Sequence, residues 1–406
     1  MPTPTSGGRT VAAPGARTVK AAPAKVVKAA APAKKAAAPA KKAAAPAKKP
    51  APATKAPAVK ASAAKKAPAA KAPVAKAPAA KAPAKAAKKP AARDLTSAAE
   101  AAKSVAKAQP APNGVTPDGT IPSSEAKARA AGVGPTGRKK PVFPDPKPLK
   151  KHGPARILAM CNQKGGVGKT TTTINLGAAL AELDRKVLLV DFDPQGALSV
   201  GLGVNPLALE QTVYNLLMEP GVTADDVVLK TDLPGLDLMP SNIDLSAAEV
   251  QLVNEVAREQ TLARALAPIA PEYDVILVDC QPSLGLLTVN ALTAADGVII
   301  PSECEFFALR GVALLIQTIE KIRERLNPDL ELEGILATMY DSRTLHGREV
   351  LARIVEAFGD RVFHTVINRT IRFPETTVAG EPITTYASAS AGAHAYRELA
   401  KELLAR

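Results

Sequence analysis

Residues 154–406 predict an α/β domain built on a doubly wound, mostly parallel sheet, preceded by a disordered basic tail. Three observations support this fold class. Short apolar runs alternate with longer amphipathic stretches, as in successive βα units. Several of the runs, such as KVLLVDF at 186–192, are apolar almost throughout, which is typical of strands covered on both faces. A glycine-rich turn also joins the first apolar run to the first amphipathic stretch.

The elements follow from these patterns in chain order. Strands are predicted where Val, Ile and Leu cluster in runs of four to eight residues. They fall at 156–161, 186–192, 235–239, 274–279, 297–300, 332–338 and 362–367. Helices are predicted where apolar residues recur every three or four positions. They fall at 169–183, 244–266, 284–293, 306–326, 346–358 and 389–405.

The first 153 residues have a composition opposite to that of the rest. They contain 32 Lys and Arg against 5 Asp and Glu, whereas residues 154–406 contain 21 against 33. The motif AAAPAKK occurs three times in succession over 29–49, and proline at this density prevents regular helices. Alanine buries too little apolar area to offset the entropy of ordering. Residues 1–93 are therefore predicted to be a disordered Lys/Ala/Pro-rich tail, and 94–153 a linker.

The cysteines and the apolar runs bear on the compartment. Cys161, Cys280 and Cys304 each fall at or near a predicted strand end, without a C-x-x-C spacing. Buried, reduced thiols are therefore predicted. No apolar run approaches the ~18–20 residues of a membrane span, and the N-terminus lacks the apolar segment of a secretory signal. These features predict a cytoplasmic protein.

The glycine-rich turn has the features of a phosphate-binding loop. Residues 161–172 read CNQKGGVGKTTT. Its glycines let backbone N–H groups close around phosphate oxygens at a helix N-terminus. Lys169 can reach the β- and γ-phosphates, and the Thr170 hydroxyl can bind Mg²⁺. The common G-x-x-x-x-G-K-[ST] pattern would place glycine at Gln163; here a second lysine, Lys164, heads the loop instead.

The pattern K-G-G-x-G-K-[ST]-[ST] is the deviant Walker A motif, and the chain resembles the ParA/MinD family of P-loop ATPases. The resemblance covers nearly all of 155–406 and is similar to the chromosomal ParA (Soj) branch, for example in GALSVGLG at 196–203. It implies that the nucleotide is ATP and that Lys164 reaches across a dimer interface to the nucleotide of the other subunit. The predicted nucleotide-binding residues are Lys164, Gly165, Gly166, Val167, Gly168, Lys169, Thr170 and Thr171.

Two carboxylates follow the second strand, in the segment VDFDPQG at 190–196. Side chains two apart on a strand point the same way, so Asp191 and Asp193 can both face a Mg-nucleotide. In ParA-like ATPases the second Asp of D-x-D-P-Q-G orients the attacking water. By this resemblance Asp193, with Lys164, is catalytic, and residues 194–196 form a switch that senses the γ-phosphate. The alternative is that Asp191 and Asp193 cap the following helix.

A third carboxylate, Asp279, ends the strand predicted at 274–279 and matches a Walker B pattern. It would bind Mg²⁺ through water molecules. The predicted metal-binding residues are Thr170, Asp191, Asp193 and Asp279. The family usually has D-x-P-P or D-x-A-P at this point, whereas this chain has Gln281.

The resemblance also implies that the dimer binds double-stranded DNA without sequence preference. Arg343 and Arg372 match the DNA-contacting arginines of the family, and Arg369 is a nearby candidate. The alternative for each arginine is a solvated surface charge. The lysine-rich tail offers a second route to DNA, through counterion release. The alternative for the tail is a spacer.

Together these features predict an ATP- and Mg²⁺-dependent, dimerising ATPase that drives chromosome or plasmid partitioning at the nucleoid. Hydrolysis would be slow until a ParB-type partner stimulates it. The alternative is a MinD-like or other ATPase that positions a cargo at a membrane, or a non-chromosomal cargo. MinD ends in an amphipathic membrane helix, whereas residues 398–406 resemble the last packing helix of the domain. No membrane partner is therefore expected.

Overall fold

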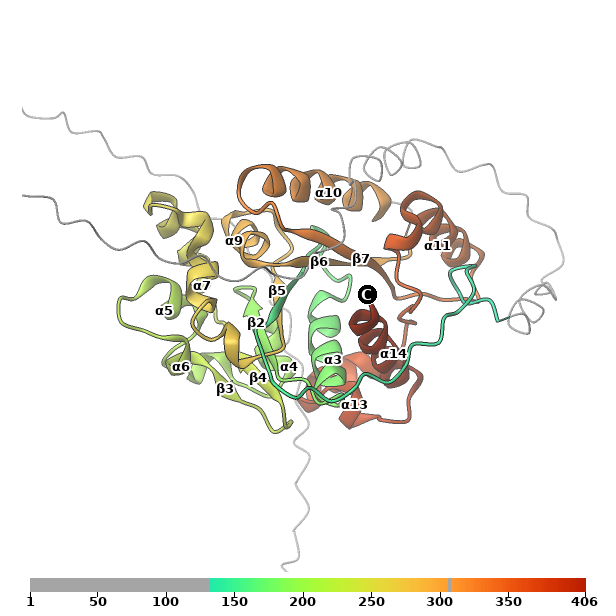
Figure 1. Ribbon diagram of the computed structural model, residues 1–406, viewed down its shortest axis with the longest axis horizontal. Coiled ribbons are helices and arrows are strands. Elements are labelled where there is room, and N and C mark those ends of the chain that lie inside the picture. The colour runs from blue at the N-terminus through green and yellow to red at the C-terminus, as the bar shows by residue number, and fades with distance from the viewer. Residues whose placement is uncertain (1–131, 306–307) are drawn as a thin grey trace, which may run out of the picture. The chain divides into compact units, whose positions relative to one another are not determined.

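A seven-stranded sheet lies at the centre of the domain (Figure 1). The computed structural model describes residues 132–305 and 308–406. The strand order is β3-β4-β2-β5-β1-β6-β7, and every neighbouring pair is parallel except β3 with β4. The strands are β1 (Arg156–Met160), β2 (Val187–Phe192), β3 (Leu229–Lys230), β4 (Leu236–Met239), β5 (Val275–Cys280), β6 (Gly297–Glu303) and β7 (Glu331–Thr338). This order confirms the predicted doubly wound, mostly parallel sheet.

Helices cover both faces of the sheet. One face packs against α5 (Val213–Met218), α6 (Ala224–Val227), α7 (Leu245–Gln251), α8 (Thr261–Leu266), α9 (Leu286–Ala294), α10 (Ala308–Arg325) and α11 (Leu345–Phe358). The other packs against α3 (Lys169–Ala181), α4 (Ala197–Gly201), α12 (Arg372–Ala379), α13 (Ile383–Tyr386) and α14 (Ala391–Ala405). Figure 1 shows α10 and α11 on one side of the strands, with α3 and α14 on the other.

The two cores explain why the strand sequences are apolar throughout. On β2, Leu188 and Val190 pack into the core beneath α9 and α10, whereas Val187 and Leu189 pack into the core beneath α3 and α14. Successive side chains of a strand point to opposite faces, so both sets must be apolar. The strand ends gather at one edge, where α3 begins.

The strand predicted at 362–367 is wrong, because its pairing with β7 is interrupted. An isolated bridge pairs Val362 with Ile335, and the next backbone bond to β7 comes only at Ile367, whose N–H donates to the Ala337 carbonyl at 2.9 Å. The backbone N–H groups of His364 and Thr365 instead donate to the buried carboxylate of Glu402 on α14, at 2.8 and 2.9 Å. These are groups that a continuous strand would direct into a ladder.

The single helix predicted at 244–266 is also wrong. It is divided into α7, two 3-10 turns (Leu252–Asn254 and Arg258–Gln260) and α8. Asn290 of α9 fixes the break, because its side chain donates to the Arg258 carbonyl at 2.9 Å and accepts the Leu262 N–H at 3.2 Å. The sequence patterns did not predict β3 or the short helices α4, α5, α6, α12 and α13, which are too brief to show a period.

Residues 132–153, which the sequence assigned to the linker, lie along the domain and contact it. We call this segment the strap; Figure 1 shows it crossing below α14 and α3. Arg138 donates to the carbonyls of Gly359, Val362 and Phe363 at 2.6–3.3 Å. Further along the strap, Lys140 and Asp145 pair with Glu398 and Lys401 of α14, and His152 bonds Asp274. The predictions for the tail and for the rest of the linker, 1–131, lie outside the described residues.

Candidate nucleotide site

The predicted phosphate loop lies between β1 and α3, at the carboxyl edge of the sheet. Gly166 and Gly168 have φ angles of 74° and 86°, a left-handed conformation that a Cβ disfavours. Gly168 immediately precedes α3, whose start has no side-chain cap. The N–H groups of the first helical turn are therefore directed into the loop, an arrangement suited to an anion.

Neighbouring strands hold this loop in shape. Asn162 donates to the Pro301 carbonyl of β6 at 2.7 Å and accepts the Lys164 N–H at 3.0 Å. The Thr338 hydroxyl, at the end of β7, donates to the Val167 carbonyl at 2.8 Å. Neither Asn162 nor Thr338 was predicted, because the Pro301 and Val167 carbonyls that they bond lie more than a hundred residues away along the chain.

A cavity of about 260 Å³ opens at the loop. Its lining residues are Gly165, Gly166, Gly168, Lys169, Thr170, Thr171, Asp193, Pro282 and Met339. The fold thus brings Asp193 to the predicted loop, while Val167 is buried beneath it. Met339 was not predicted; it has a φ of 50°, unusual for a residue with a side chain. Lys169 is 6 % exposed and bonds the Lys164 carbonyl at 3.3 Å.

Two carboxylates lie side by side below the cavity. Asp191 on β2 and Asp279 on β5 are paired in the parallel register, and both are buried. Burial and the neighbouring charge of Asp191 raise the pKa of Asp279 to about 8, although the nearby Thr170 hydroxyl and the charge of Lys169 act in the opposite direction. Burial raises the pKa of Asp191 to about 6.

One oxygen of the Asp279 carboxylate lacks a hydrogen-bond partner. Its Oδ1 accepts the Thr173 hydroxyl at 3.4 Å, whereas Oδ2 is buried without a hydrogen-bond partner. Buried polar atoms are nearly always satisfied, and a carboxylate oxygen is a ligand that Mg²⁺ prefers. The residues present therefore fit a divalent cation between Asp279 and the Thr170 hydroxyl.

Both oxygens of the Asp191 carboxylate accept hydrogen bonds. Its Oδ2 accepts the N–H and hydroxyl of Ser199 at 2.9 and 2.7 Å, and its Oδ1 accepts the Asp193 N–H at 3.3 Å. These contacts anchor α4, the helix-related role that the sequence left open for this residue. The Asp193 Oδ1 accepts the Gln195 N–H at 3.0 Å, within the segment predicted to be a switch.

Lys164 does not line the cavity. Its ammonium group lies 2.9 Å from Glu303 Oε2 and 2.5 Å from Glu305 Oε2, beyond the end of β6. Gln281, the departure from the family pattern, donates to the Glu249 carboxylate of α7 at 3.2 and 3.4 Å.

All three cysteines are free and buried, as predicted. The sulfur atoms of Cys161 and Cys280 lie 3.1 Å apart at the ends of β1 and β5.

The three predicted DNA-binding arginines lie near one another: Arg343 and Arg369 on two neighbouring loops, and Arg372 at the first residue of α12. The Tyr340 N–H donates to the Ile367 carbonyl at 3.1 Å, and the Arg369 N–H donates to the Tyr340 carbonyl at 3.0 Å. This pairing places the loop of Arg343 beside the segment that carries Arg369 and Arg372. Each guanidinium forms an exposed ion pair, with Asp341, Glu303 and Glu375 in turn.

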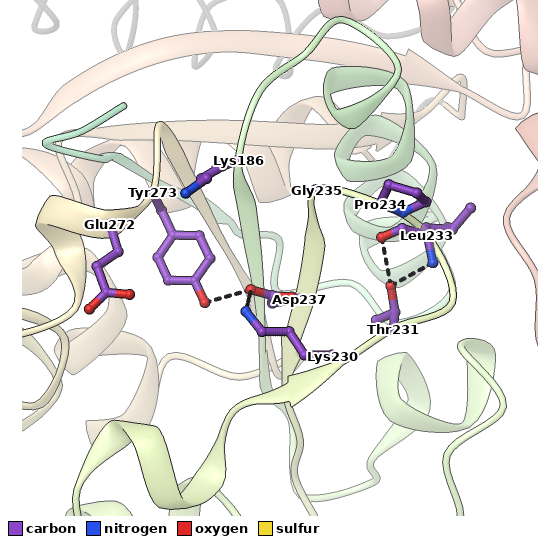
Figure 2. A pocket seen from close by; sticks show the side chains of 9 residues that line it. All are labelled: Lys186, Lys230, Thr231, Leu233, Pro234, Gly235, Asp237, Glu272 and Tyr273. Atoms are coloured by element: carbon purple, nitrogen blue, oxygen red, sulfur yellow. Dashed lines mark hydrogen bonds and ion pairs between the residues drawn. The ribbon is translucent and has the colours of Figure 1, made fainter. Parts of the chain in front are cut away.

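A second cavity, of about 250 Å³, lies at the opposite edge, where β2, β4 and β5 begin (Figure 2). Tyr273 and Lys230 both bond the Asp237 carboxylate there, at 2.8 and 2.6 Å. Its central groups thus satisfy one another, and ligands of such sheets bind at the other edge. Within 132–305 and 308–406, no helix combines the length and hydropathy needed to cross a bilayer.

Known proteins are similar in sequence to residues of this domain. A family model described as an AAA domain matches residues 155–332. An uncharacterised protein of Mycobacterium tuberculosis is 66 % identical over 275 residues, which cover 68 % of this chain and 86 % of that protein. The sporulation initiation inhibitor protein Soj of Bacillus subtilis is 47 % identical over 250 residues, covering 62 % and 98 %. The chromosome partitioning protein ParA of Caulobacter vibrioides is 47 % identical over 255 residues, covering 62 % and 95 %.

Solved structures show the same fold. The structure of cobyrinic acid a,c-diamide synthase of Mycobacterium smegmatis, with a bound ATP analogue and magnesium, has 45 % identity and a TM-score of 0.55, covering 62 % of this chain and 94 % of that one. The septum site-determining protein MinD of Pyrococcus horikoshii, complexed with Mg-ADP, has 26 % identity and a TM-score of 0.52, covering 61 % and 96 %. From the sequence relatives and this shared fold, the chain belongs to the ParA/Soj family of P-loop ATPases.

Proposed function

We propose that this protein is a Mg²⁺-dependent ATPase that dimerises on ATP, binds DNA without sequence preference and drives chromosome or plasmid partitioning. The observation that carries the proposal is the two-lysine loop. Lys169 is buried beside the cavity, and Lys164 stands outside it with 42 % of its side chain exposed. A lysine so placed is available to a second subunit, as the family mechanism requires.

Within one subunit, the cavity-lining N–H groups and Lys169 would hold the phosphates. Asp279 and Thr170 would hold Mg²⁺, which neutralises phosphate charge during hydrolysis. Asp193 lies at the cavity and would orient the attacking water. Asp191 would position the switch segment rather than bind the cation directly, because both of its oxygens already accept hydrogen bonds from Ser199 and Asp193. These assignments agree with the nucleotide and magnesium named for the M. smegmatis structure.

DNA binding is proposed for the surface formed by Arg343, Arg369 and Arg372. Residues 154–406 carry a net negative charge, so only a local cluster of arginines can attract the backbone. The ion pairs of Arg369 and Arg372 are single contacts made by exposed guanidinium groups. The pair of Arg343 with Asp341 is bidentate but lies at the surface, so DNA phosphates can compete for all three guanidinium groups. The basic tail would add a second contact and keep the protein at the nucleoid.

We also propose a route from the nucleotide to DNA, through the contact between α12 and α4. Helix α12 begins at Arg372 and packs on α4, which follows the switch segment. At this contact the backbones touch, because a Cβ added at Gly380 would lie 2.8 Å from the Gly203 Cα. Movement of α4 on ATP binding would therefore displace α12 and its arginine.

The test is filter binding or anisotropy on random-sequence DNA, with ADP or a slowly hydrolysed ATP analogue. We expect analogue-dependent binding that Arg343→Ala and Arg372→Ala each weaken severalfold, with analogue affinity unchanged. Removal of residues 1–131, which leaves the strap in place, should reduce binding at low salt and flatten its salt dependence. An unchanged slope would assign the tail a spacer role.

The same assay addresses the MinD-like alternative. Helix α14 packs into the core through Tyr396, Leu399 and Leu403, which confirms the prediction of a packing helix at the C-terminus. A helix buried in this way is not available to a bilayer. Failure to bind DNA in either nucleotide state, together with intact ATP-dependent dimerisation, would favour another cargo. Stimulation of hydrolysis by a ParB-type partner is measured as phosphate release with and without that protein.

A further inference from the structure

Lys164, the lysine at the head of the loop, is held by two acids of its own chain. Its ammonium bonds Glu303, the last residue of β6, and Glu305 just beyond it, at 2.9 and 2.5 Å. Strand β6 lies beside β1, so the two strand ends bring the acids to the loop. The hydrogen bond between Lys164 and Glu305 raises the pKa of the lysine and lowers the pKa of the glutamate.

The two acids differ in how firmly they are held. The Glu303 side chain is 12 % exposed, so its neighbours hold it in place, and its second oxygen also accepts Arg369 at 3.1 Å. The Glu305 side chain is 49 % exposed. Lys164 is therefore paired with one anchored and one accessible carboxylate, both outside the nucleotide cavity.

We propose that Glu303 and Glu305 form an acidic latch: positioning residues that hold Lys164 in the single subunit and release it on dimerisation. The proposal rests on the proposed role of Lys164 across the dimer interface. On dimerisation Lys164 would lose its ion pairs with two carboxylates and gain contacts with the phosphates of the nucleotide in the second subunit. The free energy of dimerisation therefore includes only the difference between these two sets of contacts. The latch thus raises the ATP concentration at which the dimer forms.

The test is sedimentation velocity of the full chain over a series of concentrations of a non-hydrolysable ATP analogue. Glu305→Gln and the double variant Glu303→Gln/Glu305→Gln keep the side-chain shapes and remove the charges. We expect dimerisation midpoints about threefold to tenfold lower than in the unaltered protein, since exposed ion pairs are weak. The matched control is Glu356→Gln on α11, an exposed glutamate that leaves Lys164 untouched.

The outcomes separate the latch from the proposed function. An unchanged or higher midpoint in both latch variants, relative to Glu356→Gln, overturns the latch. Lys164→Ala, measured alongside, tests the dimer role itself. If it abolishes dimers while the latch variants behave like the control, the latch fails and the dimer role stands. If dimers persist in Lys164→Ala, the dimer role of the lysine fails first.

A second measurement needs no dimer. Acetic anhydride reacts with neutral amines, and the latch keeps Lys164 protonated. Labelling of the nucleotide-free protein at pH 8, read by peptide mass spectrometry, should be severalfold faster at Lys164 in the latch variants than in Glu356→Gln. Equal rates would contradict the latch even if the variants dimerise normally.

Discussion

Replacing Asp279 by asparagine should stabilise the nucleotide-free protein near neutral pH while removing its response to Mg-ATP. The carboxyl is fully buried beside Asp191, and its pKa is raised from 3.8 to about 8. A raised carboxyl pKa means that the folded state binds the proton more tightly than the unfolded state. The contribution of this carboxyl to the free energy of unfolding therefore falls as pH rises from about 4 to about 8. Asparagine has no such dependence.

The magnitude follows from the same shift. At pH 7 the unfolded carboxyl is about 3 pH units above its pKa, so the unfavourable environment costs at most ~4 kcal/mol at ~1.36 kcal/mol per unit. Because the neighbouring Asp191 shares the effect, we take half, ~2 kcal/mol. For a domain of this size that raises Tm by about 4–8 °C. At pH 5 the gain should shrink to about a third.

The assay is thermal unfolding of both proteins in EDTA at pH 5, 6, 7 and 8, repeated with Mg-ATP at pH 7. We expect the Asn variant to be more stable in EDTA, increasingly so toward pH 8, and to show little stabilisation by Mg-ATP. A variant that is less stable than the unaltered protein at pH 8 in EDTA would refute the reasoning.

Three further substitutions test other parts of the account. Gly168→Ala places a Cβ at a φ of 86°, which costs ~1–2 kcal/mol of backbone strain, and should lower ATP affinity by about fivefold to thirtyfold in calorimetry; unchanged affinity would contradict the loop geometry. Arg138→Ala releases the strap and should lower stability by ~2 kcal/mol in urea, the worth of charged hydrogen bonds to carbonyls; a loss below ~0.5 kcal/mol would mean that the strap is not held there. Gly380→Ala should separate α12 from α4 and weaken analogue-dependent DNA binding without weakening ATP binding; equal DNA affinity would remove the proposed route.

The parts that sequence predicted are those whose determinants are local. The phosphate loop needs glycine at two left-handed positions and lysine at the helix start, all within seven residues. The strands that are buried on both faces are continuous apolar runs. Asp193 and Asp279 could be placed at the site because parallel strands end at a common edge, so a motif after each strand reaches the same cavity.

The parts that sequence missed depend on distant partners. Glu402 accepts hydrogen bonds from the backbone N–H groups of residues 364 and 365, so these residues do not form the strand that the apolar pattern predicted. Asn290 divides a helix whose own sequence shows no break. The strap looks like a linker because it lacks a period, yet Arg138 finds three carbonyls more than 200 residues away. The partners of Lys164 were invisible for the same reason.

The role of Lys164 in ATP-dependent DNA binding is the central claim, and one measurement tests it most directly. Binding of the full chain to random-sequence DNA is compared with that of Lys164→Ala, in ADP and in a slowly hydrolysed ATP analogue. The account predicts analogue-dependent binding that Lys164→Ala abolishes while still binding the nucleotide. Binding that ignores the nucleotide and is equal in both proteins would contradict it.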